Sequence, residues 1–318
     1  MKTKRSIVIL YRDLCEEWID LLSRAHFNTL GLHFIPDRFE MDGYLDWIER
    51  EGRPLIERAE AAGITVEHEL HALRYLLPRD LFDTHPEYFR VDAEGNRTPK
   101  HNCCTASAEA MAIVEARSCA LARALRQKSH RYYLWSDDTS KGWCHCEKCR
   151  QISSSDQNLI FMEHVLRGLR RYDPQAEVCY LAYHETLTPP TLPIPDGIFL
   201  EFAPFTKRDL FQPLGNEVNR PIREDIEALL RVFDPEKAEI LEYWLDVSLF
   251  TKWGKLPLSR VPYLPEVWES DFDYYTSLGI PALKTFGAFM DRLYLRTFGD
   301  YEITEYGARL QERLGDNS

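Results

Sequence analysis

Hydrophobic positions along the chain follow two alternating periods. Short runs rich in β-branched and aromatic residues, typical of strands, alternate with amphipathic segments whose apolar residues recur at helical spacing. Eight segments have the strand pattern: Ser6 to Tyr11, Asn28 to Phe34, Ile64 to His71, Tyr132 to Asp137, Glu177 to Tyr183, Ile198 to Phe202, Glu239 to Leu245 and Ala282 to Phe286. The helical patterns between them include EEWIDLLSRAHF, AEAMAIVEARSCALARALRQ and LIFMEHVLRGLRRY.

Eight β/α units predict an α/β protein that is a single (β/α)8 barrel, the TIM barrel, over residues 1–318, with longer βα loops after strands three and four. Such barrels commonly run to about 250 residues. No remaining segment is large enough for a second domain. A doubly wound open sheet is the alternative, and it is disfavoured because no glycine-rich phosphate-binding turn follows the first strand.

The alternation of side chains along a barrel strand assigns polar residues to the lumen, because outward residues must be apolar to meet the helices. In Ile64 to His71 this turns Glu67, Glu69 and His71 inward. In Ile198 to Phe202 it turns Glu201 inward.

For the seventh strand we place Glu242, Trp244 and Asp246 inside, and Leu241, Tyr243 and Leu245 outside. Carboxylates, aromatics and histidines then gather near the carboxyl-terminal ends of strands three to seven, where barrels of this type carry their chemistry.

The composition narrows the class of ligand that the protein can be expected to bind. A formal charge of −12 disfavours a general nucleic-acid or anionic-membrane surface, so a neutral or cationic ligand fits better. No segment approaches the ~18 consecutive apolar residues of a membrane span. The N-terminal run SIVILY is too short for a secretion signal, so we expect a cytoplasmic protein whose eight cysteines are thiols or metal ligands.

Two adjacent aspartates, Asp137 and Asp138, end the fourth strand between Trp135 and Trp143. Such a pair is often only a turn or helix-capping feature. On an extended segment, however, the two side chains point to opposite sides. One can then aim at a reacting bond while the other orients a neighbouring group.

Glu242, with Asp246, is the other carboxylate candidate. Strand ends four and seven lie across the barrel mouth from each other, so carboxyl groups there could flank one glycosidic bond. A separation of about 5–5.5 Å suits retention and about 6.5–9.5 Å suits inversion of configuration. The alternative is a buried carboxylate paired with arginine or lysine.

Further residues near the strand ends suit sugar binding. Aromatic rings that could stack on a sugar are Tyr183, Tyr243, Trp244 and Trp253, and side chains that could bind hydroxyls are Glu69, His71, His184, Glu185 and Glu201. For each aromatic residue the alternative is a place in the core. The segment HELH does not have the HExxH spacing of a zinc protease.

Three closely spaced cysteines follow the aspartates. Cys144, Cys146 and Cys149 form the pattern C-x-C-x-x-C, a signal for structural zinc in a reducing compartment. Such a site needs a fourth ligand, which would be Cys103, Cys104 or His145. The alternative is three reduced cysteines that pack a compact loop. We expect no cofactor to be required for catalysis.

Several motifs together resemble a known family. They are HPEYFRVDAEGNR at 85–97, the cysteine of HNCCTAS, the strand-end aspartate followed by C-x-C-x-x-C, LAYHETLTPP at 181–190 and the late YYTSLGI. In this order they resemble the bacterial TIM-barrel family catalogued as domain of unknown function 4838. Some members of that family are assigned to glycoside hydrolase family 163, retaining endo-β-N-acetylglucosaminidases that act on N-glycans.

This resemblance implies a carbohydrate-active barrel. The family's strand-four aspartate falls on Asp138, its cysteine triplet on Cys144, Cys146 and Cys149, and its Ala-Tyr pair on Ala182 and Tyr183. The histidine of strand three falls on His71. Unlike many relatives, this chain is expected to have neither a secretion signal nor a preceding accessory domain, and this expectation argues against large extracellular N-glycans as its substrate.

We therefore expect a glycoside hydrolase that cleaves an N-acetylhexosaminide or a similar β-linked oligosaccharide. Asp138 would be the general acid/base, and Asp137, supported by Tyr183, would polarise a substrate acetamido group, which makes the reaction substrate-assisted. Glu242 as an enzyme nucleophile stays open. The alternatives are a non-catalytic carbohydrate-binding barrel and a metal-dependent isomerase or aldolase-type barrel.

Overall fold

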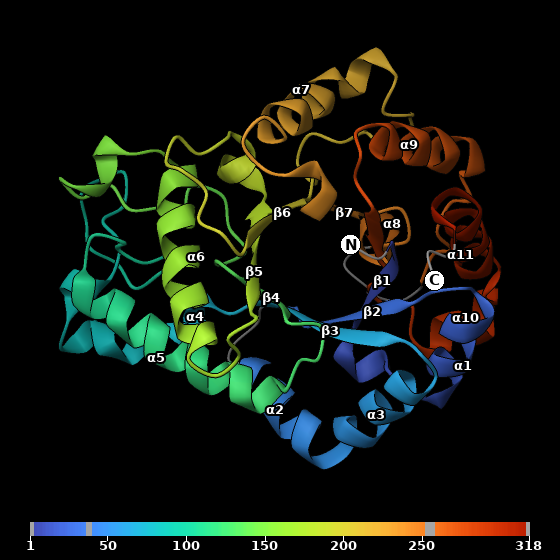
Figure 1. The fold of residues 1–318 in the computed structure, drawn as a ribbon, viewed down its shortest axis with the longest axis horizontal. Coiled ribbons are helices and arrows are strands. Elements are labelled where there is room, and N and C mark those ends of the chain that lie inside the picture. Colours follow the sequence, from blue (N-terminus) through green and yellow to red (C-terminus); the bar gives the residue numbers. More distant parts are fainter. Residues whose placement is uncertain (1–2, 36–39, 252–257, 316–318) are drawn as a thin grey trace.

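Eight parallel strands close into a barrel in sequence order, and β8 completes the ring by pairing with β1 (Figure 1). The computed structural model describes residues 3–35, 40–251 and 258–315. The strands are β1 Lys4–Leu10, β2 Thr29–His33, β3 Thr65–His71, β4 Arg131–Trp135, β5 Glu177–Ala182, β6 Ile198–Phe202, β7 Glu239–Glu242 and β8 Ala282–Phe286. The predicted (β/α)8 barrel is confirmed, and each of the eight predicted segments overlaps a strand of the barrel, although β1 and β4 begin before their predicted segments.

Helices surround the ring of strands on its outer side (Figure 1). They are α1 Glu16–Arg24, α2 Glu40–Trp47, α3 Arg53–Ala61, α4 Leu73–Leu76, α5 Ala108–Leu125, α6 Ser154–Arg170, α7 Arg220–Leu229, α8 Val247–Phe250, α9 Pro265–Ser277, α10 Arg292–Phe298 and α11 Tyr301–Leu314. A π-helical turn, Ile48–Gly52, joins α2 to α3. Serine side chains cap the long helices α5 and α6, because Ser107 and Ser153 accept hydrogen bonds from backbone N–H groups of their first turns.

The strands separate two hydrophobic clusters. The larger one lies between strands and helices and includes Val66 and Leu70 of β3 and Leu200 of β6. The smaller one fills the lumen and includes Tyr133 and Phe199. The predicted outward faces of β3 and β6 are therefore confirmed.

Four predicted placements along β7 and just after it are wrong, whereas the predicted outward position of Leu245 is confirmed. Leu241 and Tyr243 belong to the lumen cluster, whereas Trp244 packs in the outer cluster and Glu242 bonds to Tyr275 of α9. The prediction required apolar outward residues. Here Arg208 and Tyr275 bring polar partners between strand and helices, so an outward glutamate is satisfied without facing the lumen.

Buried charges hold the lower part of the lumen together. Lys4 Nζ lies 2.9 Å from Glu67 and 2.6 Å from Glu239, and Lys284 Nζ lies 3.0 Å from both Glu69 and Glu239. Burial alone would lower the pKa of Lys284, but the surrounding carboxylates hold it well above its usual range. Each buried charge thus has opposite charges beside it, as burial requires.

The loops after β3 and β4 are long, as predicted. The first, residues 72–107, contains α4 and two 3-10 turns, Arg79–Asp83 and Pro86–Tyr88. The second, residues 136–153, contains the turn Cys149–Gln151. Hydrogen bonds join them, including a backbone one of 2.8 Å from the N–H of His145 to the carbonyl of Val91.

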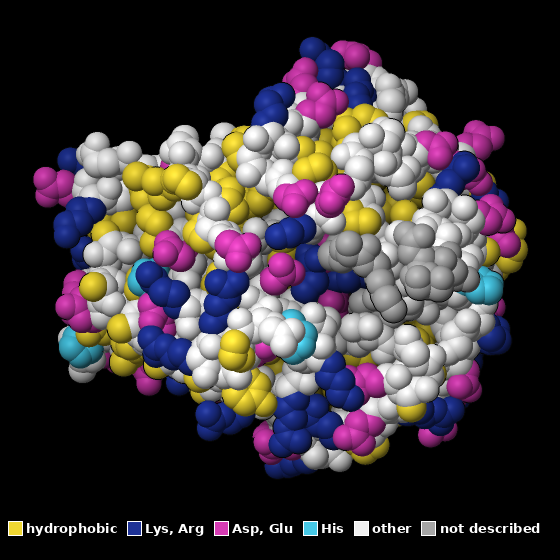
Figure 2. Space-filling view, in the orientation of Figure 1, with side chains coloured by type: hydrophobic (Ala, Val, Ile, Leu, Met, Phe, Trp, Pro, Cys, Tyr) yellow, Lys and Arg dark blue, Asp and Glu magenta, His cyan; other side chains and the backbone are white. Residues whose placement is uncertain are grey.

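The surface carries interspersed charges. On the face shown in Figure 2, Lys and Arg side chains lie among Asp and Glu side chains. Within the described residues, no helix combines the length and the hydropathy that a membrane crossing requires.

Candidate functional site

A pocket opens at the carboxyl-terminal ends of the strands and encloses about 660 Å³, including the part that is open to solvent. Every strand contributes lining residues at its end or just after it, as expected for the active face of such a barrel. The aromatic side chains of its wall are Trp135, Tyr183, Phe205, Tyr243, Phe286 and Phe289. A largely apolar wall with a few converging polar groups is the usual composition of a small-ligand site.

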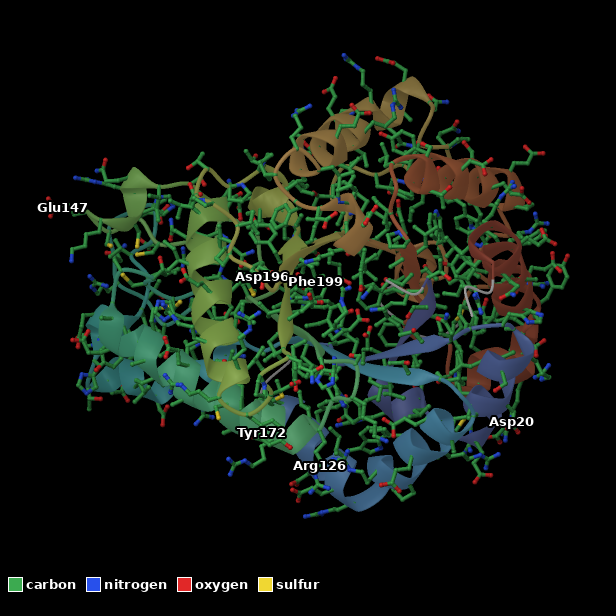
Figure 3. All side chains as sticks on the ribbon, in the orientation of Figure 1. Asp20, Arg126, Glu147, Tyr172, Asp196 and Phe199 are labelled. Atoms are coloured by element: carbon green, nitrogen blue, oxygen red, sulfur yellow. The ribbon has the colours of Figure 1, made fainter. Side chains whose placement is uncertain are left out.

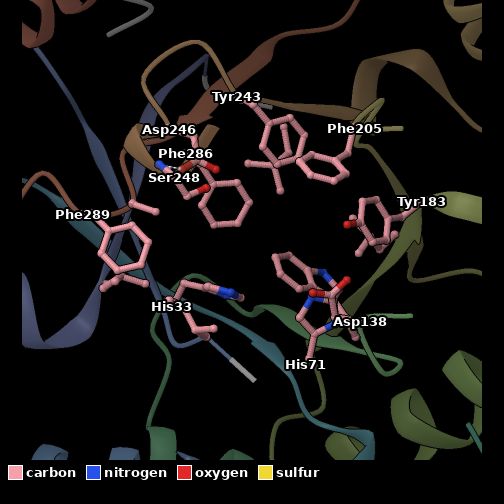
Figure 4. A pocket seen from close by; sticks show the side chains of 16 residues that line it. His33, His71, Asp138, Tyr183, Phe205, Tyr243, Asp246, Ser248, Phe286 and Phe289 are labelled. Carbon is pink, nitrogen blue, oxygen red and sulfur yellow. Dashed lines mark hydrogen bonds between the residues drawn. The ribbon is translucent and has the colours of Figure 1, made fainter. Parts of the chain in front are cut away.

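Asp138 lines this pocket, as predicted from its place after β4. Its side chain is 42% exposed, and its Oδ1 lies 3.9 Å from Nε2 of His184. The hydroxyl of Tyr183 interacts with the Asp138 carboxyl group; burial, together with this carboxyl group, raises the pKa of Tyr183. In Figure 4 Asp138 lies between His71 and Tyr183.

Asp137 does not line the pocket. Its carboxylate forms an ion pair with Arg79 of the loop after β3, and its backbone N–H donates a 2.9 Å hydrogen bond to Oδ1 of Asn102 in the same loop. The two aspartates do diverge, as the extended backbone requires. The ion pair, however, takes up the carboxylate that we expected to polarise an acetamido group.

The second carboxyl group in the pocket belongs to Asp246. It follows β7 and caps α8, since its Oδ1 accepts a 2.9 Å hydrogen bond from the N–H of Ser248. Burial raises the pKa of Asp246 to about 6. In Figure 4 Asp246 and Asp138 lie on opposite sides of the pocket.

Glu242 and Trp244 lie outside the pocket, because the outer face of β7 carries them. Glu242 is fully buried and accepts a 2.6 Å hydrogen bond from Tyr275 of α9, and Arg208 lies 3.4 Å away. Trp244 donates a 3.2 Å hydrogen bond to Asp271 of the same helix. Their surroundings make both residues part of the barrel's outer packing.

Glu69 and Glu201, predicted to bind hydroxyl groups, lie in the charged network below the pocket. Lys284 pairs with both. Burial raises the pKa of Glu69 to about 8, against the opposing effect of the Lys284 ammonium group. Neither glutamate lines the pocket.

Two histidines form part of the pocket wall. His71 was predicted, and His33 of β2 was missed. Nδ1 of His71 lies 2.6 Å from the carbonyl of Ser136, and Nδ1 of His33 lies 2.6 Å from the carbonyl of Glu69. A carbonyl only accepts, so Nδ1 carries a proton in both rings.

The ring of His33 is uncharged. Burial, followed by the neighbouring His71, lowers the pKa of His33 to about 3. A polar side chain near the end of the predicted strand Asn28 to Phe34 is a weak sequence signal for His33, but no pattern indicated that it lines the pocket.

The remaining predicted residues divide into three groups. Tyr183 and Tyr243 line the pocket. Glu185 instead accepts a hydrogen bond from the backbone N–H of Lys141 in the loop after β4. Trp253 lies outside the described residues. Phe205, Phe286 and Phe289, which line the pocket, were not predicted, because an aromatic residue after a strand does not differ in sequence from one in the core.

The three predicted cysteine ligands are brought together with a fourth. The ligand atoms of Cys104, Cys144, Cys146 and Cys149 all lie within 4.8 Å of one another. In the described part of the chain this is the only group of three or more His, Cys, Asp and Glu residues with that spacing. The described residues of the pocket therefore offer no comparable ligand set for a metal-dependent isomerase.

A family model matches residues 22–250 of the chain, and its description is "Domain of unknown function (DUF4838)". The chain belongs to the DUF4838 family. This confirms the family that the sequence motifs resemble. No curated protein sequence matches this member of the DUF4838 family.

Solved structures of glycoside hydrolases share the fold of this DUF4838 protein. A GH42 β-galactosidase from G. stearothermophilus, solved as a catalytic mutant, is 15% identical with a TM-score of 0.58, over 99% of this chain and 58% of its own. A β-galactosidase from Rahnella sp. R3 is 13% identical with a TM-score of 0.59, over 99% and 57%.

A third similar structure is a GH5-4 broad-specificity endoglucanase from an uncultured bacterium. It is 11% identical with a TM-score of 0.55, over 94% of this chain and 84% of its own. The DUF4838 chain thus spans 57–58% of the length of these β-galactosidases. At such identities the likeness shows the (β/α)8 fold alone.

Proposed function

We propose that this protein is a glycoside hydrolase that cleaves a neutral β-linked oligosaccharide, with an N-acetylhexosaminide as the first substrate to test. The observation that carries the proposal is the presence of two carboxyl groups, Asp138 after β4 and Asp246 after β7, on opposite sides of one aromatic-lined pocket. Hydrolysis of a glycosidic bond commonly uses such a pair.

The surroundings of the two carboxyl groups differ in the way that this chemistry requires. Asp246 is buried, and its pKa of about 6 keeps part of it protonated near neutral pH, so we assign it as the general acid. Asp138 is more exposed, and the hydroxyl of Tyr183 interacts with its carboxyl group. It would act as the nucleophile, or as the base that activates water.

This assignment replaces the substrate-assisted reaction through Asp137. Substrate assistance needs a carboxylate that polarises the acetamido group, and the Asp137 carboxylate is paired with Arg79 outside the pocket. It also replaces Asp138 as the acid, because burial raises the pKa of Asp246, the carboxyl group on the other side of the pocket.

The wall of the pocket suits a sugar ring. Tyr243 and Phe286 lie nearly parallel, with ring centroids 5.4 Å apart and an interplanar angle of 21°, and both line the pocket. Such faces can pack on the apolar side of a pyranose. The Nε2 atom of His33 can accept a hydrogen bond from a hydroxyl group, since this ring is uncharged and carries its proton on Nδ1.

The deciding experiment is a screen of aryl glycosides and N-glycan fragments with the wild type, Asp138→Asn and Asp246→Asn. Asp196→Asn is the matched control, because Asp196 is exposed and precedes β6 at the opposite end of the barrel. On substrates whose leaving group needs a proton, we expect turnover by the wild type and the control only. A ligand that raises the Tm of the wild type without releasing product would contradict the proposal and support a carbohydrate-binding barrel.

The roles of the two residues are separable by azide. Azide replaces a missing carboxylate, and the anomeric configuration of the glycosyl azide tells which one is missing in a retaining enzyme. We expect Asp138→Ala to give an azide of inverted configuration and Asp246→Ala one of retained configuration. The opposite pattern would exchange the two roles.

A further inference from the structure

Four cysteines from two separate loops meet away from the pocket. Cys104 comes from the loop after β3, and Cys144, Cys146 and Cys149 come from the loop after β4. Sγ of Cys104 lies 3.7 Å from Sγ of Cys146 and 3.9 Å from Sγ of Cys149. Cys104, Cys144 and Cys149 are buried.

These separations fit four thiolates around one ion. Sulfur atoms at the corners of a tetrahedron, each about 2.3 Å from a central zinc, lie about 3.8 Å apart. A disulfide would need about 2.05 Å between its sulfur atoms. All four cysteines are free thiols, so the cluster is not a pair of disulfides.

Hydrogen-bond donors surround the sulfur atoms. The backbone N–H groups of Val91 and Cys146 point at Sγ of Cys144, at 3.3 Å and 3.4 Å, and the hydroxyl of Thr105 lies 3.7 Å from Sγ of Cys149. Donors of this kind stabilise thiolates and orient them toward a metal.

The backbone that carries the ligands is held from outside the cluster. Gln157 of α6 accepts a 3.0 Å hydrogen bond from the N–H of Cys144 and donates to the carbonyls of Cys144, at 3.2 Å, and Cys149, at 3.3 Å. Arg90 of the first loop donates to the carbonyl of Lys141 in the second, at 3.1 Å. The ligand geometry is therefore preorganised by contacts that need no metal.

We propose that Cys104, Cys144, Cys146 and Cys149 bind one structural zinc ion that joins the loops after β3 and β4. The thiols lose their protons when the ion binds, and all four positions of the tetrahedron are taken by protein, so no place is left for water or substrate. None of the four lines the pocket. Glu147, between the last two ligands in the sequence, lies at the edge of the molecule, apart from the strands (Figure 3).

The two joined loops also hold the end of β4. Asn102, two residues before Cys104, accepts the hydrogen bond from the N–H of Asp137, and Arg79 of the same loop pairs with the Asp137 carboxylate. The zinc would thus keep the segment that carries Asp138 in place. This last consequence rests on the proposed function, whereas the metal site does not.

The test is the metal content of the purified full chain. We expect one zinc per chain by mass spectrometry of the metals, and its release, detected with a metallochromic dye, when a mercurial reagent modifies the thiols. Growth with cobalt should give the visible bands of tetrahedral Co²⁺ and thiolate charge-transfer absorption. Less than one tenth of an equivalent of zinc, after reconstitution under reducing conditions, would overturn the proposal. Stoichiometric iron would overturn the identity of the ion.

Variants identify the ligands. Cys104→Ser should lower the zinc content to well under one equivalent, while Cys119→Ser on α5, outside the cluster, should keep it. Full zinc in Cys104→Ser would remove Cys104 from the site. If Cys104→Ser does not fold, counting the thiols of the native wild type that react before and after zinc removal decides the question: protection of four thiols by zinc supports the site, and protection of none overturns it.

Discussion

The neighbouring aspartates at the end of β4 face different surroundings: Asp138 lines the pocket beside Tyr183, whereas Asp137 pairs with Arg79 of the loop after β3. One extended segment therefore supplies both the carboxyl group of the pocket and the ion pair that holds the segment in place. The ion pair of Asp137 sets the direction of the backbone, and this direction determines where the Asp138 side chain points.

Replacing Asp138 should remove activity and leave the fold intact. Acid–base and nucleophilic groups contribute about 10²–10⁴-fold to such rates, so Asp138→Asn should lower kcat/KM by at least the lower figure. Its side chain is 42% exposed, so the Tm should hardly change. The measurement is kcat/KM on an aryl glycoside beside Asp196→Asn. Normal turnover by Asp138→Asn would exclude Asp138 from the reaction.

The activity should fall as the pH rises through about 6. Burial raises the pKa of Asp246 to about 6, and a general acid works only while it is protonated. The basic limb of kcat/KM against pH reports this group. Asp246→Asn should lose the limb and retain turnover of dinitrophenyl glycosides, whose leaving group needs no proton. A limb that persists in Asp246→Asn would assign the titration to another group.

Breaking the ion pair of Asp137 should destabilise the protein. A partly buried charge left without its partner costs about 1–3 kcal/mol, so Arg79→Met should lower the free energy of unfolding by that amount. Both side chains are less than one fifth exposed, at 15% and 17%. Urea unfolding of the wild type, Arg79→Met, Asp137→Asn and the double variant gives the coupling free energy between the two side chains. Additive effects would show that the pair contributes nothing.

Glu242→Gln should affect stability and spare catalysis. The buried Glu242 bonds to Tyr275 and lies 3.4 Å from Arg208, so loss of its charge should cost about 1–3 kcal/mol. Because the side chain faces α9, kcat/KM of the folded protein should stay within a factor of two or so of the wild type. A loss comparable to that of Asp138→Asn would return Glu242 to the catalytic role that its place after a strand first suggested.

Asp13, in the turn after β1, should make the protein less stable as the pH rises. Burial, followed by the charge of Asp291, raises the pKa of Asp13 to about 7 in the folded state from 3.8. The folded state thus holds this proton more tightly, so the contribution is full below pH ~4 and lost between pH ~4 and 7. Asp13→Asn should flatten this part of the curve of unfolding free energy against pH, by about 4 kcal/mol at most. An unchanged curve in Asp13→Asn would contradict this prediction.

The sequence was sufficient to predict the barrel, because strand and helix periods alternate eight times and strands such as β3 carry apolar residues on one face only. It was sufficient for Asp138 and His71, since a polar residue at the end of such a strand faces the mouth. It failed for β7, where both faces contain large side chains. The outward Glu242 is satisfied by Arg208 and Tyr275, and only the packed structure brings these three together.

The same limit applies to the buried glutamates and to the metal site. Glu69 and Glu201 faced inward as predicted, but their partner Lys284 is far away in the sequence, so the pairing could not be read from the local pattern. Among the three candidates for the fourth metal ligand, spacing in the sequence could not distinguish Cys103 from Cys104. The fold separates them, because Cys104 reaches the other sulfur atoms.

The paired lysines and glutamates in the lower lumen also determine the route by which a ligand can enter and leave the pocket. Lys4, Lys284, Glu67, Glu69 and Glu239 fill the barrel with side chains that are at most 11% exposed, so the pocket is a blind end. An oligosaccharide cannot thread through the ring of strands. In the proposed reaction, water, the incoming sugar and the departing fragment would all use the pocket opening at the carboxyl-terminal ends of the strands, so product has to leave before the next chain can enter.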